Sequence, residues 1–235
     1  MMSDMNRIGL LRMTEFVGVT RDMHGTYAAL FEEFFKNHPV EIVDVPMHEG
    51  ASPESLDDCD GWVITGSPAS VYEDLDWIAT GEEIVRAALA EERPMVGICF
   101  GHQLIAQALG GRVEKASVGW GIGAQRYDTI RALPQLEQSV ATTLLASHQD
   151  QVVELPDDAS VWSSADYCPF AGFTVGERML TMQGHPEFTP QLVTTLYDSR
   201  RDRLGDAAVD AAMTTLGNPL SNDSIAAAIV RLIAG

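Results

Sequence analysis

Residues 95–111 constrain the fold more than any other part of the chain. Residues 95–98 are all small or apolar and are predicted to form a short buried strand. Residues 103–109 have the composition of a helix, and Gly110-Gly111 marks its end. Cys99 therefore lies on the turn between a strand and a helix.

A cysteine on such a turn is well placed to act as a nucleophile. The sharp turn strains Cys99, and the flanking glycines Gly97 and Gly101 relieve crowding where the backbone passes close by. The N-terminus of the following helix favours the thiolate, and its free N–H groups can hold an oxyanion. An isolated G-x-C-x-G match is more often a buried structural cysteine, but the order strand, turn, helix favours the nucleophile. A phosphate-binding glycine loop is excluded, because neither G-x-G-x-x-G nor G-x-x-x-x-G-K-[ST] occurs.

Strand-like and helix-like segments alternate from residue 7 to residue 110. The predicted strands are residues 7–13, 40–45, 61–65 and 95–98, and the predicted helices are residues 27–35 and 77–91, with a loop at 48–58. Such alternation predicts an α/β fold with an open, mostly parallel sheet flanked by helices on both faces.

The second half of the chain begins with a different pattern. Residues 112–171 contain short alternating segments punctuated by prolines, namely residues 124–130, 143–147, 151–154 and 160–163. These predict a small antiparallel β extension. A hairpin is expected over residues 173–182 with its turn at Gly176-Glu177, followed by helices at 190–204 and 222–233. No linker or repeat interrupts the chain, so residues 1–235 are expected to form a single domain.

Composition narrows the classes of partner and compartment. A net charge of −19 disfavours binding to nucleic acid or to an anionic membrane surface. No apolar run is long enough for a membrane span, and the N-terminus does not have the pattern of a signal peptide, so a cytoplasmic location is expected. The three cysteines form neither a paired framework nor a C-x-x-C motif. We expect no metal and no cofactor.

Three strand ends carry chemically useful residues. In open α/β sheets, functional residues collect beyond the carboxyl ends of the strands. Gly66-Ser67 follows the strand at 61–65, Cys99 follows 95–98, and His185 with Glu187 follows 179–182. Positions i and i+2 of an extended segment point the same way, so Glu187 could orient His185 while His185 faces Cys99.

A second histidine competes for that role. His148 and Asp150 have the same i, i+2 spacing, and the spacing alone does not choose between the two pairs. His185 is favoured because it lies between a strand and a helix start, whereas His148 lies among short irregular strands.

These segments together carry a resemblance to a known family. Three blocks resemble the signature blocks of class I (triad-type) glutamine amidotransferase domains: Gly97-Ile98-Cys99-Phe100-Gly101-His102-Gln103-Leu104, Ser147-His148-Gln149-Asp150 and Gly184-His185-Pro186-Glu187. Gly66-Ser67-Pro68-Ala69-Ser70-Val71-Tyr72 further resembles a segment of the GMP-synthase-like branch. The similarity spans roughly residues 40–190 in the expected order and spacing.

The resemblance implies an activity and a role for each matching residue. Cys99 would attack the γ-amide of glutamine or of a γ-glutamyl compound, His185 would act as general base and acid, and Glu187 would orient His185. A γ-glutamyl thioester would form, with release of ammonia or an amine. The same resemblance settles the choice between the histidines in favour of His185, and it assigns no chemistry to His102.

The resemblance also implies the groups that bind the substrate. The backbone N–H groups of Phe100 and of Gly66 or Ser67 would form the oxyanion hole. The glutamate moiety would lie against Gln103, Ser147, Gln149 and Asp150.

Two departures from the family pattern affect the expected function. Ser67 and Gln149 stand where close relatives often have glycine, so the oxyanion loop and the substrate rim are expected to differ in shape. No synthetase domain is expected in the chain. Three readings stay open: a glutaminase serving a separate synthetase partner, a self-sufficient γ-glutamyl peptidase, and a non-catalytic regulatory module. The intact Cys99, His185 and Glu187 argue against the third.

Overall fold

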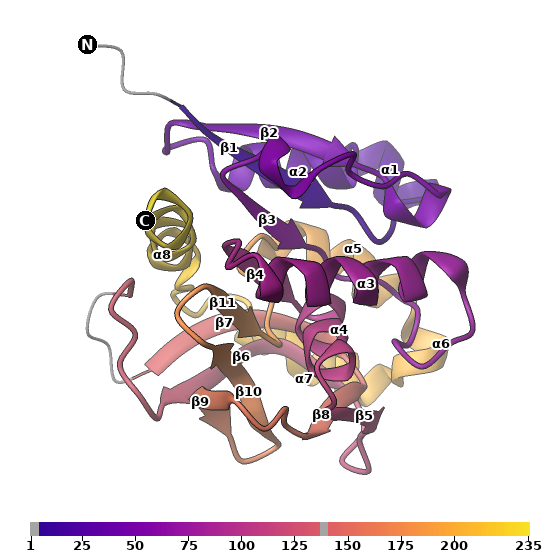
Figure 1. The fold of residues 1–235 in the computed structure, drawn as a ribbon. Helices are drawn as coiled ribbons and strands as arrows, with labels where there is room; N and C mark the ends of the chain where they lie inside the picture. The colour runs from indigo at the N-terminus through magenta and orange to yellow at the C-terminus, as the bar shows by residue number, and fades with distance from the viewer. Residues whose placement is uncertain (1–4, 137–140) are drawn as a thin grey trace.

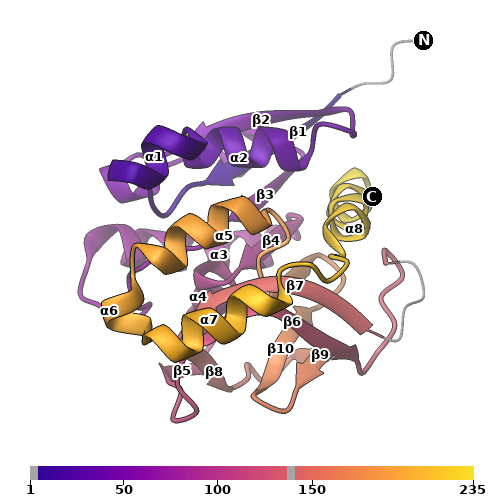
Figure 2. The same cartoon turned by 180° about the vertical axis from the view of Figure 1, so that it is seen from behind.

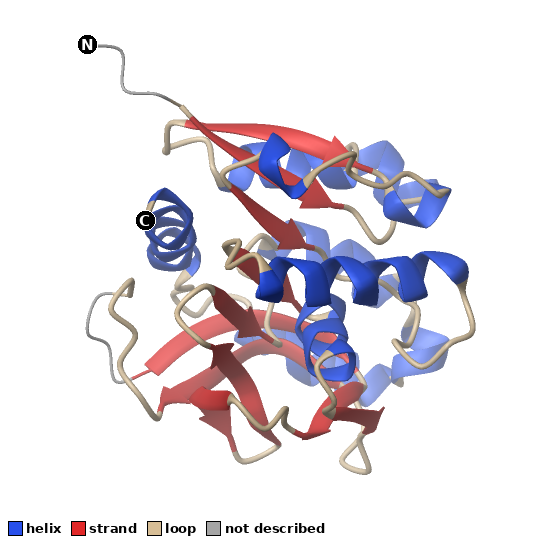
Figure 3. Cartoon of the chain, in the orientation of Figure 1, coloured by secondary structure: helices blue, strands red, loops and turns tan. Residues whose placement is uncertain are grey.

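A nine-stranded sheet forms the centre of the molecule. The computed structural model describes residues 5–136 and 141–235, and within them the strand order is β2-β1-β3-β4-β11-β10-β9-β6-β7 (Figure 1). Helices cover both faces of this sheet, as the front and back views show (Figures 2 and 3). The predicted α/β fold, with a mostly parallel sheet and an antiparallel extension, is confirmed.

The parallel half of the sheet contains the strands that precede the candidate site residues. Its members are β1 (Asn6–Leu11), β2 (Val40–Val45), β3 (Gly61–Ile64), β4 (Met95–Ile98) and β11 (Met179–Met182). All neighbouring pairs among them run parallel. The strands β3, β4 and β11 are fully buried, which explains their continuous apolar sequences.

The antiparallel half comes from the region with short alternating segments. It consists of β6 (Gly121–Thr129), β7 (Ala141–His148), β9 (Ala159–Ala165) and β10 (Cys168–Val175). The strands β10 and β11 form the predicted hairpin. A separate two-stranded sheet joins β5 (Arg112–Lys115) to β8 (Asp150–Glu154). The extension therefore continues the main sheet, because β10 pairs with the central strand β11.

Eight α-helices lie in the described residues. They are α1 (Gly18–His24), α2 (Tyr27–Phe34), α3 (Asp76–Ala90), α4 (Phe100–Ala108), α5 (Pro190–Asp198), α6 (Arg201–Leu204), α7 (Asp206–Thr215) and α8 (Asn222–Ala234). The structure does not contain a membrane-spanning candidate among these helices, because none combines the needed length and apolarity.

Several sequence-based expectations need correction. The expected helix at 190–204 is broken at Arg200, whose φ of −126° and ψ of 18° are not helical, so α5 and α6 are separate. The helix after Cys99 starts at Phe100, earlier than the expected residue 103. The expected loop at 48–58 contains two short 3-10 helices, η1 (Met47–Glu49) and η2 (Leu56–Asp58). The helices α1 and α7 were not predicted, because each buries few apolar side chains and shows little periodicity.

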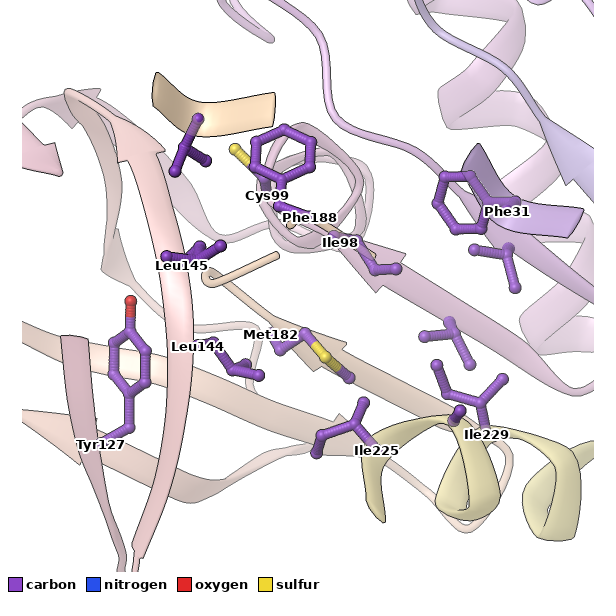
Figure 4. Packing of buried hydrophobic residues seen from close by; sticks show 14 of the residues in the cluster. Phe31, Ile98, Cys99, Tyr127, Leu144, Leu145, Met182, Phe188, Ile225 and Ile229 are labelled. Atoms are coloured by element: carbon purple, nitrogen blue, oxygen red, sulfur yellow. The ribbon is translucent and has the colours of Figure 1, made fainter. Parts of the chain in front are cut away.

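Two hydrophobic cores lie on opposite faces of the sheet. One contains side chains of α2, α5, α7 and α8, and the other contains side chains of α3 and α4. Figure 4 shows Ile225 and Ile229 of α8 packing toward Met182 of the sheet in the first core. Cys99 and Phe188 lie at the edge of the same core (Figure 4). Burial of these side chains therefore holds the candidate site in place.

Candidate active site

Cys99 occupies a strained turn at the carboxyl end of β4. Its φ of 53° and ψ of −102° lie outside the regions that non-glycine residues usually adopt. Among the described residues, Glu92 is the only other non-glycine residue with positive φ. Such a conformation costs on the order of 1–3 kcal/mol and persists only where the surroundings enforce it. Two hydrogen bonds do so here, because the Cys99 N–H donates to the Met182 carbonyl at 2.9 Å and its carbonyl accepts from Gln103 at 3.1 Å.

The glycines on either side of Cys99 allow this turn to pack closely. A Cβ atom added at Gly97 would lie 2.5 Å from the carbonyl oxygen of Gly101. A Cβ atom added at Gly101 would lie 2.4 Å from the carbonyl oxygen of Ile64 in β3. Both contacts are far inside van der Waals distance and involve backbone atoms. Glycine is therefore required at both positions for the observed approach of the turn to the neighbouring strand.

His185 faces Cys99 and is paired with Glu187. The segment that follows β11 is held by a hydrogen bond from the His185 N–H to the Leu145 carbonyl at 2.8 Å. The His185 Nδ1 atom lies 2.7 Å from Glu187 Oε1, and both side chains are buried. The Phe188 ring stacks on the imidazole with 3.8 Å between centroids, which fixes the ring plane. The predicted pairing of His185 with Glu187 is present.

The surroundings of His185 favour its charged form. Burial alone would lower the pKa of the imidazole, but the charge of Glu187 and a hydrogen bond with Cys99 outweigh it and raise the pKa to about 10. A protonated His185 next to Cys99 stabilises a thiolate there. The site can therefore hold a thiolate–imidazolium pair.

Tyr27 completes this group and was missed by the sequence reasoning. Its buried hydroxyl donates a hydrogen bond to Glu187 Oε1 at 3.1 Å, the same oxygen that pairs with His185. Burial and the nearby Glu187 raise the pKa of Tyr27, so the hydroxyl keeps its proton and remains a donor. No local pattern marks this tyrosine, because it lies 160 residues from Glu187 in the sequence.

His148, the competing histidine, has different surroundings. Its Nδ1 atom lies 3.2 Å from the backbone carbonyl of Asp150, and not beside a carboxylate. The Asp150 carboxylate instead accepts a hydrogen bond from Ser70 at 2.5 Å. Burial lowers the pKa of His148 to about 4, so its ring is neutral near pH 7. The geometry agrees with the preference for His185.

The other predicted site residues lie around the same cavity, with one exception. The cavity that exposes Cys99 and His185 has a volume of about 510 Å³, and Gly66, Ser67, Gln103, Ser147, Gln149 and Asp150 line it. The Gln103 side-chain amide donates to the Asp150 carbonyl at 2.8 Å and thereby ties α4 to the rim. Phe100 does not line the cavity, since its ring packs on Trp77, but its N–H begins α4 beside Cys99.

The walls of this cavity also contain residues that the sequence did not indicate. Residues 14–20 form one wall, and Arg200 and Arg203 at the junction of α5 and α6 form another. Among the described residues, no group of three or more His, Cys, Asp or Glu side chains is arranged to hold a metal ion.

The chain is similar to known proteins over most of its length. The family model for the class-I glutamine amidotransferases matches residues 20–197. Gamma-glutamyl peptidase 3 of Arabidopsis thaliana is 30% identical over 194 residues, which cover 79% of this chain and 77% of that protein. A glutamine-hydrolysing GMP synthase subunit of Halobacterium salinarum is 31% identical over 169 residues, which cover 71% of this chain and 86% of that relative.

A solved structure supports the same fold. The crystal structure of a glutamine amidotransferase from Thermotoga maritima superposes with a TM-score of 0.77 at 18% sequence identity, covering 98% of this chain and 96% of that chain. The match of the family model over most of the chain, with the relatives that it resembles, places the protein in the class-I glutamine amidotransferase family.

Proposed function

We propose that this protein hydrolyses the γ-amide bond of glutamine or of a γ-glutamyl compound through a thioester on Cys99. One observation carries the proposal: Cys99 lies on a strained turn at the cavity wall, next to a buried His185 that Glu187 holds at 2.7 Å. The names of the relatives, a γ-glutamyl peptidase and a glutamine-hydrolysing component of a synthase, support it.

The first step is attack by Cys99 on the γ-carbonyl carbon. His185 takes the Cys99 proton in this step, because the raised pKa of its imidazole, about 10, makes it a good base. A C–S bond forms and the carbonyl oxygen becomes an oxyanion. The backbone N–H of Phe100, with that of Gly66 or Ser67, stabilises this oxyanion by about 3 kcal/mol for each well-placed donor.

The second step breaks the C–N bond. His185 gives its proton to the leaving nitrogen, so ammonia or an amine departs and a γ-glutamyl thioester remains. The neutral imidazole then takes a proton from water, the resulting hydroxide attacks the thioester, and the C–S bond breaks to release glutamate. Glu187 and Tyr27 keep the Nδ1 side of His185 oriented throughout, so that the other ring nitrogen serves Cys99 and the leaving group.

The size of the cavity bears on the substrate. About 510 Å³ lies within the range of pockets that hold drug-sized ligands, and free glutamine is smaller than such ligands. This supports γ-glutamyl compounds whose leaving amine is larger than ammonia. Gln103, Ser147, Gln149 and Asp150 hold the glutamate moiety in this proposal.

The test is release of glutamate by the purified protein from glutamine and from γ-glutamyl amides of increasing size. We expect faster turnover of the larger amides, and loss of turnover in Cys99→Ser and in His185→Ala. Lys36→Gln is a suitable control, because Lys36 is exposed and pairs with Glu33, away from the cavity. Absence of turnover on every substrate would contradict a self-sufficient hydrolase. Activity that survives Cys99→Ser would contradict the thioester.

A further inference from the structure

Three cations line the cavity that contains Cys99. They are Lys115 at the end of β5, Arg200 between α5 and α6, and Arg203 in α6. The chain as a whole has a net charge of −19, with 34 acidic and 15 basic residues. A cluster of three basic side chains at this one cavity is therefore opposite in sign to the rest of the molecule.

These cations have no carboxylate partner in the part of the chain that the structure describes. No ion pair to an acidic residue involves Arg200, Arg203 or Lys115 there, and Arg203 lies over the Trp120 ring at 4.8 Å. The adjacent Arg201 is different, since its guanidinium contacts Asp198, Asp206 and Asp210. Burial and the like charge of Arg203 lower the pKa of Arg200, because no carboxylate offsets them.

The two acidic residues of the cavity do not neutralise these cations. Glu15 accepts the N–H groups of Phe16 and Tyr27 at 2.8 Å and pairs with Arg12 and Arg21. The Asp150 carboxylate accepts the Ser70 hydroxyl. An anion that entered the cavity would therefore meet arginines whose charge is not already paired.

The position of Arg200 indicates which part of a substrate it meets. Arg200 lines the cavity together with Tyr27, whose hydroxyl contacts Glu187, and with Phe188, whose ring stacks on His185. It therefore lies on the His185 side of the cavity. His185 protonates the leaving nitrogen in the proposed reaction, so the leaving amine occupies the same side. When that amine is an amino acid, its carboxylate is one carbon away from the nitrogen that His185 protonates.

We propose that Arg200, assisted by Arg203, binds a carboxylate on the leaving amine, so that the preferred substrates are γ-glutamyl amino acids and peptides. This inference rests on the proposed function. The planar guanidinium presents paired N–H donors that match a carboxylate, and partial burial of Arg200 strengthens the attraction by reducing solvent screening. Glutamine and γ-glutamyl alkylamines lack this carboxylate and gain nothing from the arginines.

The experiment compares two substrates that differ only in that charge: γ-glutamyl-alanine and γ-glutamyl-alaninamide. We expect kcat/KM of the wild-type protein to favour the acid by about tenfold to a hundredfold, the range for hydrogen bonds to charged groups. In Arg200→Gln the ratio of the two kcat/KM values should fall close to one, and in Arg203→Gln it should fall part of the way. Arg200→Lys keeps the positive charge but not the paired N–H donors, so its ratio should lie between those of the wild-type protein and Arg200→Gln. Arg201→Gln is the matched control, because Arg201 does not line the cavity and should leave the ratio unchanged.

Two kinetic outcomes would overturn the inference. One is a wild-type ratio near one, and the other is an Arg200→Gln variant that loses activity equally on both substrates, as expected if Arg200 held the glutamate moiety common to both. Dissociation constants of both compounds for Cys99→Ser, with and without Arg200→Gln, give the same test without turnover. If the wild-type protein hydrolyses neither compound and Cys99→Ser still binds the acid more tightly in an Arg200-dependent way, the proposed hydrolysis fails and the carboxylate site stands. Equal binding of acid and amide would overturn the site.

Discussion

Replacing Gly101 with alanine tests whether the close packing of the Cys99 turn is required. The added Cβ would lie 2.4 Å from the Ile64 carbonyl oxygen and 2.8 Å from the Ile64 Cβ, where ordinary contacts begin near 3.4 Å. About 1 Å of movement is therefore needed. The strand cannot supply it freely, because Ile64 is paired on one side with Leu11 and on the other with Gly97. The turn that carries Cys99 must shift instead.

The expected magnitude follows from that geometry. Overpacking of this kind costs about 1–3 kcal/mol, partly offset by the better helix propensity of alanine in α4. For a chain of this size each kcal/mol lowers the melting temperature by roughly 2–4 °C, so we expect a decrease of about 2–12 °C for Gly101→Ala. In the proposed reaction, a displacement of Cys99 by about 1 Å should also lower kcat/KM by about a hundredfold.

Thermal unfolding followed by circular dichroism, with kinetics on a γ-glutamyl amide, measures both effects. Gly217→Ala is the matched control, since nothing lies within 4 Å of its added Cβ and its φ is not positive. It should leave the melting temperature unchanged or raise it slightly, because alanine restricts the unfolded chain. If Gly101→Ala has the same melting temperature as Gly217→Ala and keeps full activity, the steric reasoning is wrong.

Four further predictions concern the titratable groups of the site. Tyr27→Phe removes the hydroxyl that donates to Glu187, so kcat should fall by about tenfold or more and its pH profile should move; a change in KM alone would argue against a positioning role. Glu187→Gln removes the charge that contributes most to raising the pKa of His185, so an NMR titration should give a value near 10 in the wild-type protein and a lower value in the variant. Because the folded-state pKa of His185 is raised, its stabilising contribution is complete below about pH 6.5 and is lost as the pH rises toward 10. The unfolding free energy of the wild-type protein should therefore fall over that window, and that of Glu187→Gln should change less. Iodoacetamide near neutral pH should modify Cys99 first, as read by mass spectrometry, because burial raises the pKa of Cys168 to about 12 and Cys168 does not line the cavity; first modification at Cys168 would refute this.

Local sequence patterns predicted the parts of the site that depend on neighbours in the chain. The strand before Cys99 and the helix after it follow from apolar runs and a glycine pair, and the pairing of His185 with Glu187 follows from the i, i+2 geometry of an extended segment. The start of α4 was placed too late, because Gly101 is a weak helix former whose helical conformation comes from packing against β3.

Contacts between distant segments were not predictable in this way. Tyr27 contacts Glu187, which lies 160 residues away in the sequence, and no local sequence pattern near either residue predicts that contact. The break between α5 and α6 at Arg200 likewise contains no proline or glycine from which it could be predicted. Arg200 nevertheless lies on the cavity wall because of this break. Periodicity reports which face of an element is buried, and it carries no information about which element covers that face.

The sequence by itself therefore determined the α/β fold, the turn that carries Cys99, and the histidine and carboxylate that follow the last central strand. Only the tertiary structure decided that His148 binds a backbone carbonyl, that Tyr27 supports Glu187, and that Arg200 and Arg203 face the cavity without acidic partners among the described residues. The physical reason is that backbone preferences and hydrophobic periodicity act over a few residues, whereas side-chain hydrogen bonds and charge pairs form between whichever groups the packing of the two cores brings together.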